Sequence, residues 1–378
     1  MNALLLTVTL AQTLSGSVFL DRNGNGVRDP GEHGIADVAV SDQDTVVLTL
    51  ADGSYRLPAG RGHGIVFISV PNGYRSVGKF WRRANDNQQF ALSPQLQVQN
   101  FTFIHASDTH ISEQSAPRTR RLRALTDSLR PDFVIITGDL VRDALRVGEA
   151  EARGYYDLFM GVIGVFTRPV FTTPGNHENF GIETARSGVS PTHPLFGKTM
   201  YRSYLGPDYY SFNYGGVHFV ALNTADVRGE DYYGHVDSLQ LAWLERDLAN
   251  VPARMPVVTF NHIPFFSTSE LMYGYNPEPP APTLIVVNGK SVFRHTVSNA
   301  ADVLAVLAKR RHVLALGGHV HMRELIQYGW QGEPRRFENA AAVVAPTKVA
   351  GREFPSGITL YRVRGGVIDA GTFVRLDP

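Results

Sequence analysis

Five short polar motifs in the chain each follow a stretch of apolar residues. They combine carboxylate, imidazole and amide groups, which are common ligands of divalent cations in proteins. In chain order they are Asp108-Thr109-His110, Gly138-Asp139, Gly175-Asn176-His177-Glu178, Asn261-His262 and Gly318-His319-Val320-His321. Because a lone histidine is usually an ordinary core or surface residue, histidines outside these motifs, His295 among them, are interpreted as structural.

Together the motifs provide seven candidate metal ligands: Asp108, His110, Asp139, Asn176, His262, His319 and His321. Seven mixed nitrogen and oxygen donors exceed the needs of one tetrahedral zinc ion. They fit two ions of higher coordination number that share one carboxylate, hold phosphate oxygens and lower the pKa of a shared water, whose hydroxide attacks phosphorus in line. Asp139 is the natural bridging residue, because a Gly-Asp pair after a buried strand leaves its carboxylate pointing outward.

The segments between the motifs predict the elements that position them. Apolar runs alternate with helical patterns, such as Leu122, Leu125 and Leu129 after the first motif. Strands that alternate with helices predict an α/β sheet with helices on its faces. Ligands of such sheets bind beyond the carboxyl ends of the strands, so we expect the five motifs to meet there.

In this order, the five motifs resemble those of the calcineurin-like metallophosphoesterase superfamily, from residue 101 to residue 378. The resemblance implies a four-layer α/β/β/α sandwich with a dinuclear metal centre. One ion would be held by Asp108, His110, Asp139 and His321, and the other by Asp139, Asn176, His262 and His319.

The resemblance also implies roles for two residues beside the ligands. His177 would act in catalysis without binding a metal, either on the leaving group or on the phosphate. Glu178 would support the site from behind, and it would set the tautomer of His177 if it holds that ring.

Residues after Asp139 exclude two branches of the superfamily. Protein Ser/Thr phosphatases continue with Asp-Arg-Gly, and purple acid phosphatases place a tyrosine ligand three residues on, where this chain has Arg142. The motifs are similar to those of class III cyclic-nucleotide phosphodiesterases and broad-specificity bacterial phosphodiesterases. We therefore expect hydrolysis of a small phosphodiester, with a phosphomonoesterase of nucleotides and a non-catalytic surface binding module as alternatives.

Composition limits the cofactors and partners. The two ions could be Mn, Fe, Zn or Co, since all bind imidazole and carboxylate. The chain has no cysteine, which excludes disulfides, thiolate ligands and cysteine catalysis. Its net charge of +1 gives no signal for nucleic acid, and no stretch has the roughly 20 apolar residues of a membrane span. The oligomeric state stays open.

Two further segments could contact the substrate. Residues 273–283 are rich in Gly and Pro and form a candidate lid loop. Tyr232-Tyr233 could stack on a base or pack within the protein.

The first part of the chain predicts a separate all-β unit. Residues 15–92 contain short strand-like runs divided by turn signals such as Ala51-Asp52-Gly53, which predicts a small β-sandwich. This unit resembles the accessory domain of secreted bacterial phosphoesterases. Residues 93–100, at the end of a polar stretch, are the expected linker to the domain at 101–378.

Residues 21–32 have the spacing of a calcium-binding loop, with Gly26 at the sixth position. The expected oxygen donors are Asp21, Asn23, Asn25, Val27, Asp29 and Glu32. The alternative is a polar loop of Asx turns without an ion.

Residues 1–14 are the candidate for an export signal. The segment is apolar and reaches small residues at Thr9-Leu10-Ala11, but it lacks a basic start. Together with the calcium loop it predicts export to the periplasm, the cell surface or the medium. A first β-strand, a misplaced start codon and a cytoplasmic location are the alternatives.

Overall fold

The computed structural model describes residues 13–58, 62–274, 276, 282–329, 334–349 and 351–377. The chain forms two compact units that divide between Leu96 and Gln97. No helix in the described ranges has the length and hydropathy of a membrane span. The first twelve residues of the predicted signal segment lie outside the described part, and Leu14 already belongs to the first strand.

The N-terminal unit contains two four-stranded sheets, each with mainly antiparallel neighbours. The first sheet, in spatial order, consists of β4 (Ser54–Leu57), β1 (Leu14–Leu20), β8 (Gln89–Pro94) and β6 (Tyr74–Ser76). The second consists of β3 (Val46–Leu48), β2 (Ala39–Ser41), β5 (Ile65–Ile68) and β7 (Trp81–Arg83).

Both sheets contribute to one apolar core. Val18 and Phe90 of the first sheet lie in the same buried cluster as Val40 and Ile68 of the second, which confirms the predicted all-β sandwich. The connection to the next unit is shorter than expected, because β8 includes Ser93 and Pro94 and the next strand starts at Asn100. The linking residues are therefore 95–99.

The larger unit contains two six-stranded mixed sheets. Sheet I consists of β11 (Val170–Thr173), β10 (Phe133–Thr137), β9 (Asn100–Ala106), β24 (Gly357–Arg364) and β25 (Val367–Ile368), with β26 (Thr372–Arg375) also on β24. Sheet II consists of β12 (Tyr210–Tyr214), β13 (Val217–Ala221), β16 (Pro256–Phe260), β19 (Arg311–Gly317), β21 (Arg335–Asn339) and β20 (Glu324–Tyr328).

Helices and short hairpins connect these strands. The helices are α1 (Ala116–Leu129), α2 (Glu149–Ile163), α3 (Thr184–Ser187), α4 (Lys198–Leu205), α5 (Ser238–Ala249), α6 (Ser269–Tyr273) and α7 (Ala300–Leu307). The hairpins pair β14 (Ala225–Arg228) with β15 (Asp231–Gly234), β17 (Leu284–Val287) with β18 (Lys290–Phe293), and β22 (Thr347–Val349) with β23 (Arg352–Phe354).

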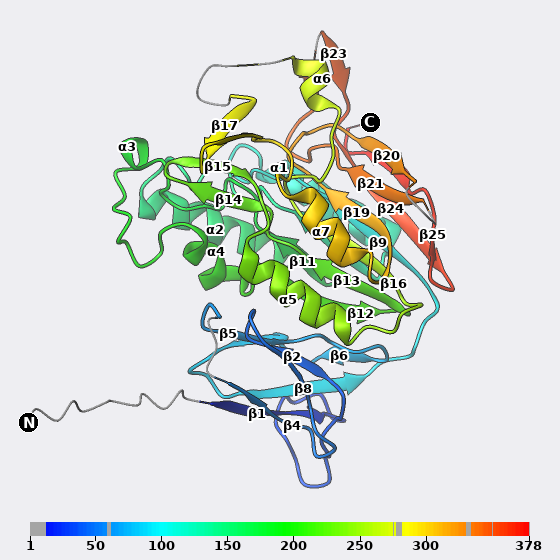
Figure 1. Ribbon diagram of the computed structural model, residues 1–378. Coiled ribbons are helices and arrows are strands. Elements are labelled where there is room, and N and C mark those ends of the chain that lie inside the picture. The colour runs from blue at the N-terminus through cyan, green and yellow to red at the C-terminus, as the bar shows by residue number, and fades with distance from the viewer. Residues whose placement is uncertain are drawn as a thin grey trace, which may run out of the picture. The chain divides into compact units, whose positions relative to one another are not determined.

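The two sheets of this unit pack face to face through aromatic rings. Phe133 of sheet I contacts Phe212 and Phe219 of sheet II, with ring centroids 5.7 and 5.2 Å apart. On its other face, sheet I packs against α1 and α2 in one buried cluster. Asp247 of α5 accepts a hydrogen bond from Ser211 of sheet II. The layers are thus helix, sheet, sheet and helix, as predicted (Figure 1).

The parallel strands explain where the polar motifs lie. Strands β9, β10 and β11 run parallel in sheet I, and β13, β16 and β19 run parallel in sheet II. Each of the five motifs directly follows or lies just beyond the carboxyl end of β9, β10, β11, β16 or β19. The fold therefore brings residues from five distant parts of the chain to one region.

Candidate metal centre

The structure gathers the predicted ligands into two adjoining groups. Within each group, the candidate ligand atoms lie within 4.8 Å of one another. The first group contains Asp108, His110, Asp139 and His321, and the second contains Asp139, His262 and His319. Asn176 adjoins the second group, because its Oδ1 atom lies 3.2 Å from His262 Nε2.

Asp139 belongs to both groups through different oxygens. Its Oδ2 atom lies 3.5 Å from His110 Nε2, and its Oδ1 atom lies 3.2 Å from His262 Nε2. Burial disfavours the charged carboxylate, but His262, His177 and His110 hold the pKa of Asp139 well below its usual value. The residue is thus placed as a charged bridge between two cation sites.

The second group fits a cation because acceptor atoms face one another. The Nδ1 atom of His262 lies 2.7 Å from the carbonyl oxygen of Thr137, which can only accept, so Nδ1 carries a proton. The Nε2 atom then faces oxygens of Asp139 and Asn176. Burial lowers the pKa of His262, yet Asp139 raises it to about 9, so a proton occupies the position that a metal ion would take.

Potential metal-binding atoms also face one another in the first group. The Nε2 atoms of His110 and His321 lie 3.2 Å apart. Asp108 Oδ1 is buried and receives no hydrogen bond from the described residues, although His321 Nε2 is 3.2 Å away. Burial, together with His177, lowers the pKa of His110 to about 4 and keeps its ring neutral. A metal ion here would be bound by Asp108 Oδ1 and by the Nε2 atoms of His110 and His321.

Most of the ligands have an unusual backbone conformation. Positive φ angles occur at five of them: Asp108 (55°), His110 (38°), Asp139 (46°), His319 (71°) and His321 (58°). A non-glycine residue in this region costs about 1–3 kcal/mol and persists only where its surroundings enforce it. Here the loops after β9 and β10 are joined by a backbone hydrogen bond, because His110 N donates to the carbonyl oxygen of Asp139 at 2.8 Å.

Gly138 is required between β10 and Asp139. Its φ angle is +76°, and a Cβ atom there would lie 2.6 Å from Cγ of His262. The Gly-Asp pair therefore turns the chain and leaves room for the imidazole ring of the second group.

His177 lies beside the first group without belonging to it. Its Nδ1 atom donates to the carbonyl oxygen of Arg142 at 2.6 Å, and its Nε2 atom lies 3.9 Å from Asp139 Oδ2. The side chain lines the cavity above the ligands. This arrangement fixes the tautomer of His177 and leaves Nε2 for a proton transfer.

Glu178 does not hold the ring of His177, so the condition under which it would set that tautomer is not met. The Glu178 carboxylate instead accepts backbone hydrogen bonds from Leu140, Val141 and Gly175, at 2.8, 2.9 and 2.5 Å. Burial and the charge of Asp139 raise the pKa of Glu178 to about 8. Its side chain lies beneath the loops after β10 and β11, where it fixes the backbone that carries Asp139 and Asn176.

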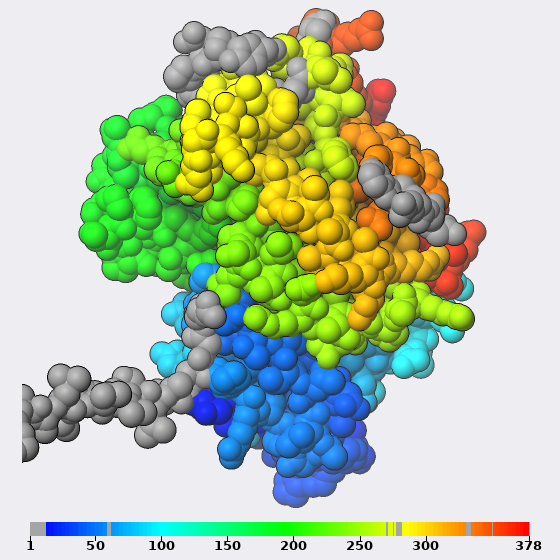
Figure 2. All heavy atoms as spheres, in the orientation of Figure 1, coloured from blue at the N-terminus to red at the C-terminus, as the bar shows by residue number. Residues whose placement is uncertain are grey.

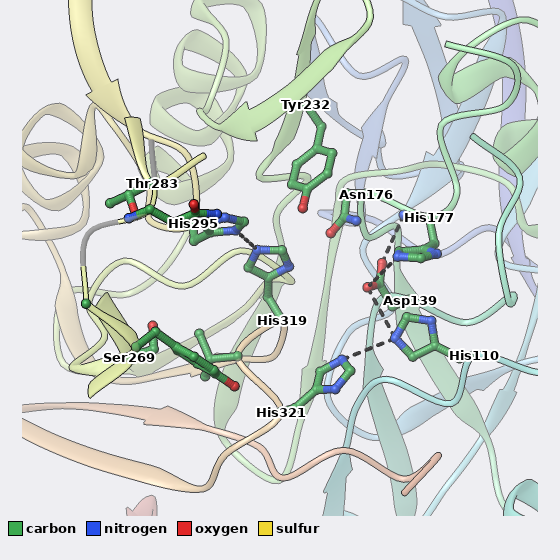
Figure 3. Close-up of a pocket in the computed structure, with 14 residues that line it drawn as sticks. His110, Asp139, Asn176, His177, Tyr232, Ser269, Thr283, His295, His319 and His321 are labelled. Atoms are coloured by element: carbon green, nitrogen blue, oxygen red, sulfur yellow. Dashed lines mark hydrogen bonds and ion pairs between the residues drawn. The ribbon is translucent and has the colours of Figure 1, made fainter. Parts of the chain in front are cut away.

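Five of the seven predicted ligands line a cavity of about 460 Å³: His110, Asp139, Asn176, His319 and His321 (Figure 3). Its described lining also includes Tyr232, Ser269 and His295, and, from the candidate lid loop, Tyr273, Gly274, Asn276 and Thr283. The rest of that loop lies outside the described residues or does not line the cavity. The phenol of Tyr232 points toward the ligands, and burial raises its pKa to about 12.

Sequence reasoning missed His295. Its Nδ1 atom lies 2.7 Å from His319 Nε2, on the side of the His319 ring away from His262. Burial and the neighbouring Arg294 lower the pKa of His295 to about 4. No motif marks this residue, because it follows the short hairpin β17–β18 and not a strand of sheet I or II.

The predicted calcium loop is held by its own polar groups. Asp21 accepts hydrogen bonds from the amides of Gly24 and Gly26, both at 2.7 Å. Asp29 accepts from the side-chain amides of Asn23 and Asn25. Glu32 accepts from the backbone amides at positions 22 and 29, and the side chain of Val27 is exposed.

Comparison with known proteins identifies the family. The family profile described as calcineurin-like phosphoesterase matches residues 101–323, more than half of the chain. A second profile, the N terminal of calcineurin-like phosphoesterase, matches residues 22–103. The chain therefore belongs to the calcineurin-like phosphoesterase family, whose activity is the hydrolysis of phosphate esters.

Individual relatives are distant. The chain is 25% identical over 245 residues to the 3′,5′-cyclic adenosine monophosphate phosphodiesterase CpdA of Escherichia coli K12, covering 61% of this chain and 72% of that protein. It is 27% identical over 188 residues to a probable cyclic nucleotide phosphodiesterase of Rhodopseudomonas palustris, covering 44% and 58% of the two chains. A dimetal phosphatase from Danio rerio aligns structurally with a TM-score of 0.44 and 15% identity, over 73% of this chain and 99% of that one.

Proposed function

We propose that this protein is a two-metal phosphodiesterase of small substrates, with cyclic nucleotides as the leading class. The observation that carries the proposal is that Asp139, which lines the cavity, presents one oxygen to each donor group. When bound, two ions would polarise the phosphate oxygens and acidify the attacking water.

His177 is the proposed acid for the leaving group. Its Nδ1–H is engaged by the Arg142 carbonyl, so a proton on Nε2 is the one that can move to the leaving oxygen as the P–O bond breaks. Tyr232 also lines the cavity and points toward Asn176, where its hydroxyl can donate to a phosphate oxygen (Figure 3).

The charge of the cavity supports a diester. A phosphodiester carries one negative charge, whereas a monoester carries almost two at neutral pH. None of the described residues that line the cavity is Lys or Arg, so among them no permanently charged side chain is present to pair with a second negative charge. Tyr273, Asn276 and Thr283 extend the cavity away from the ligands and leave room for a second ester group.

Cyclic nucleotides are proposed because the curated relatives are named as cyclic-nucleotide phosphodiesterases. A diester derived from a phospholipid is a second possible substrate of the same type. The test compares bis(p-nitrophenyl) phosphate, 3′,5′-cyclic AMP and p-nitrophenyl phosphate with added Mn²⁺. Turnover of the diesters supports the proposal, and turnover of the monoester alone would instead make the protein a phosphomonoesterase.

Mn, Fe, Zn and Co all fit a donor set of imidazole and carboxylate. Mn²⁺ is therefore one suitable probe, and it does not identify the native metal. Elemental analysis of the purified protein, with anomalous diffraction at the site, would identify the native pair.

The N-terminal unit is proposed to bind calcium at residues 21–32 and to belong to an exported protein. The support is the loop spacing and the apolar start of the chain. Calcium titration of the full chain with its Mn sites filled, compared with Asp29→Ala, tests the loop. N-terminal sequencing after expression in a bacterial host tests export, and an intact Met1 in the cytoplasmic fraction would contradict it.

A further inference from the structure

His319 is a ligand whose two ring nitrogens both face other imidazoles. Its Nδ1 atom lies 3.3 Å from His262 Nε2, on the side of the second ion, and its Nε2 atom lies 2.7 Å from His295 Nδ1. The rings of His319 and His295 have centroids 4.9 Å apart and planes inclined by only 24°. The short nitrogen contact therefore joins two rings of similar inclination at a distance suited to an N–H···N hydrogen bond (Figure 3).

This geometry links the tautomers of the two rings. For His319 to bind an ion through Nδ1, its single ring proton must reside on Nε2. That proton is then donated to Nδ1 of His295, which must be unprotonated. A neutral His295 carries its own proton on Nε2, so only one combination of tautomers is compatible with an ion in the second group.

His262 differs from His319 in the group that accepts its second ring proton. Its second nitrogen donates to the Thr137 carbonyl oxygen, which can only accept and thus fixes the tautomer by itself. Ligand histidines usually donate this proton to a carbonyl, a carboxylate or water. At His319 the acceptor is an imidazole that arrives from a separate part of the chain.

The segment that carries His295 is anchored on three sides. The Arg294 amide donates to the Thr283 carbonyl, and the Arg294 carbonyl accepts from Gly234 N, both at 3.0 Å. Val297 N donates to the carbonyl oxygen of Pro264, two residues after His262, at 2.9 Å. The Arg294 side chain is buried, with its guanidinium 4.2 Å from the ring centroid of Tyr232.

The hairpin that precedes His295 lies at the surface of the unit (Figure 2). The β17–β18 hairpin delivers Arg294 and His295 to the site, and its yellow atoms adjoin the gold atoms of α7 on the face seen in Figure 2. The ring of His295 is therefore held against His319 by a segment whose backbone bonds to three other parts of the chain, one of them the loop after β16.

We propose that His295 is a positioning residue that selects the tautomer of His319 competent to bind the second ion. The proposal rests on the two-metal centre proposed above. It assigns His295 an effect on the second ion alone, because the first group contains neither His319 nor His262.

The test uses the full chain and two substitutions at the same position. His295→Asn retains an acceptor near the position of Nδ1, whereas His295→Leu has a similar volume without one. Mn²⁺ binding is measured by equilibrium dialysis after chelation, with electron paramagnetic resonance to distinguish coupled from isolated ions. His235→Leu is the control, since His235 bonds to Ser298 and belongs to neither donor group.

We expect His295→Leu to lower the affinity for the second ion by about 10- to 100-fold and to leave the affinity for the first ion unchanged. His295→Asn should remain within a few-fold of wild type, and binding of the first ion reports that each variant is folded. Equal second-ion affinity in wild type and His295→Leu would overturn the role of His295, as would equal losses in both variants. A wild-type protein that binds one ion only would overturn the two-metal centre itself.

Discussion

Asp139 Oδ1 lies 3.2 Å from His262 Nε2, while the other nitrogen of the same ring donates to the Thr137 carbonyl. Without a cation between them, a proton on Nε2 holds this pair together. Metal binding must displace that proton, so the stability of the protein and its affinity for metal depend on pH in linked ways.

In the metal-free protein, the free energy of unfolding should fall as the pH rises from 6.5 to 9. The pKa of His262 is raised from 6.5 to about 9, so its contribution is complete below pH 6.5 and is lost as the pH passes about 9. Glu178, with a pKa raised to about 8, acts in the same direction. The pKa values of His110 and His295 are lowered, so their contributions to the free energy of unfolding decrease only as the pH falls below 6.5.

Calorimetry with a chelator and with saturating metal checks this expectation. The Tm of the metal-free protein should decline across the window, and the metal-loaded protein should lack this decline because an ion replaces the proton on His262. A metal-free Tm that stays level or rises between pH 6.5 and 9 would refute the assignment.

Substitution of Asp139 by Asn should remove the charged bridge. We expect kcat/KM for the diester to fall by at least about 100-fold, since even supporting residues of metal sites contribute 10- to 100-fold. The metal content should fall with it. Asp127→Asn on α1, which changes a partly exposed carboxylate, is the control, and an Asp139→Asn variant that keeps both ions and full activity would contradict the bridging role.

Substitution of His177 by Asn should lower kcat by about 10²- to 10⁴-fold while both ions remain bound. If His177 gives its proton to the leaving oxygen, the loss should be greater for a phenyl diester than for the p-nitrophenyl diester, whose leaving group needs less protonation. Stopped assays on the two substrates measure the difference, and an equal loss on both would exclude this role.

Substitution of Glu178 by Gln should destabilise the fold before it affects chemistry. The carboxylate accepts three backbone N–H groups, and an amide NH₂ in its place leaves at least one of them unpaired, at a cost of about 1–3 kcal/mol. Urea unfolding above pH 8, where the Glu178 carboxyl is ionised, measures the change. The exposed Glu113→Gln is the matched control and should stay within about 0.5 kcal/mol; an equal effect of both changes would argue against the proposed role.

The layered fold and the donor clusters could be predicted because each motif directly follows a strand. An apolar run that stops at Gly138-Asp139 indicates both the strand and the side chain at its carboxyl end. The direction of Glu178 could not be predicted in this way. A tight turn, in which Asn179 N donates to the Asn176 carbonyl, sends it beneath the loops and away from His177.

His295 and Tyr232 lie beyond such reasoning for a different reason. Both come from hairpins outside the two sheets, so their place depends on how irregular segments pack and not on strand order. Tyr232-Tyr233 could be interpreted as packing or as substrate contact, and only Tyr232 is among the described residues that line the cavity.

The left-handed backbone at Asp108, His110, Asp139, His319 and His321 has an evolutionary consequence. Glycine would relieve that backbone at each of these positions. A substitution to glycine there would relieve the backbone and remove a predicted metal ligand in the same step, so the strain and the metal centre cannot be selected separately. Only continued selection for turnover would preserve these five side chains.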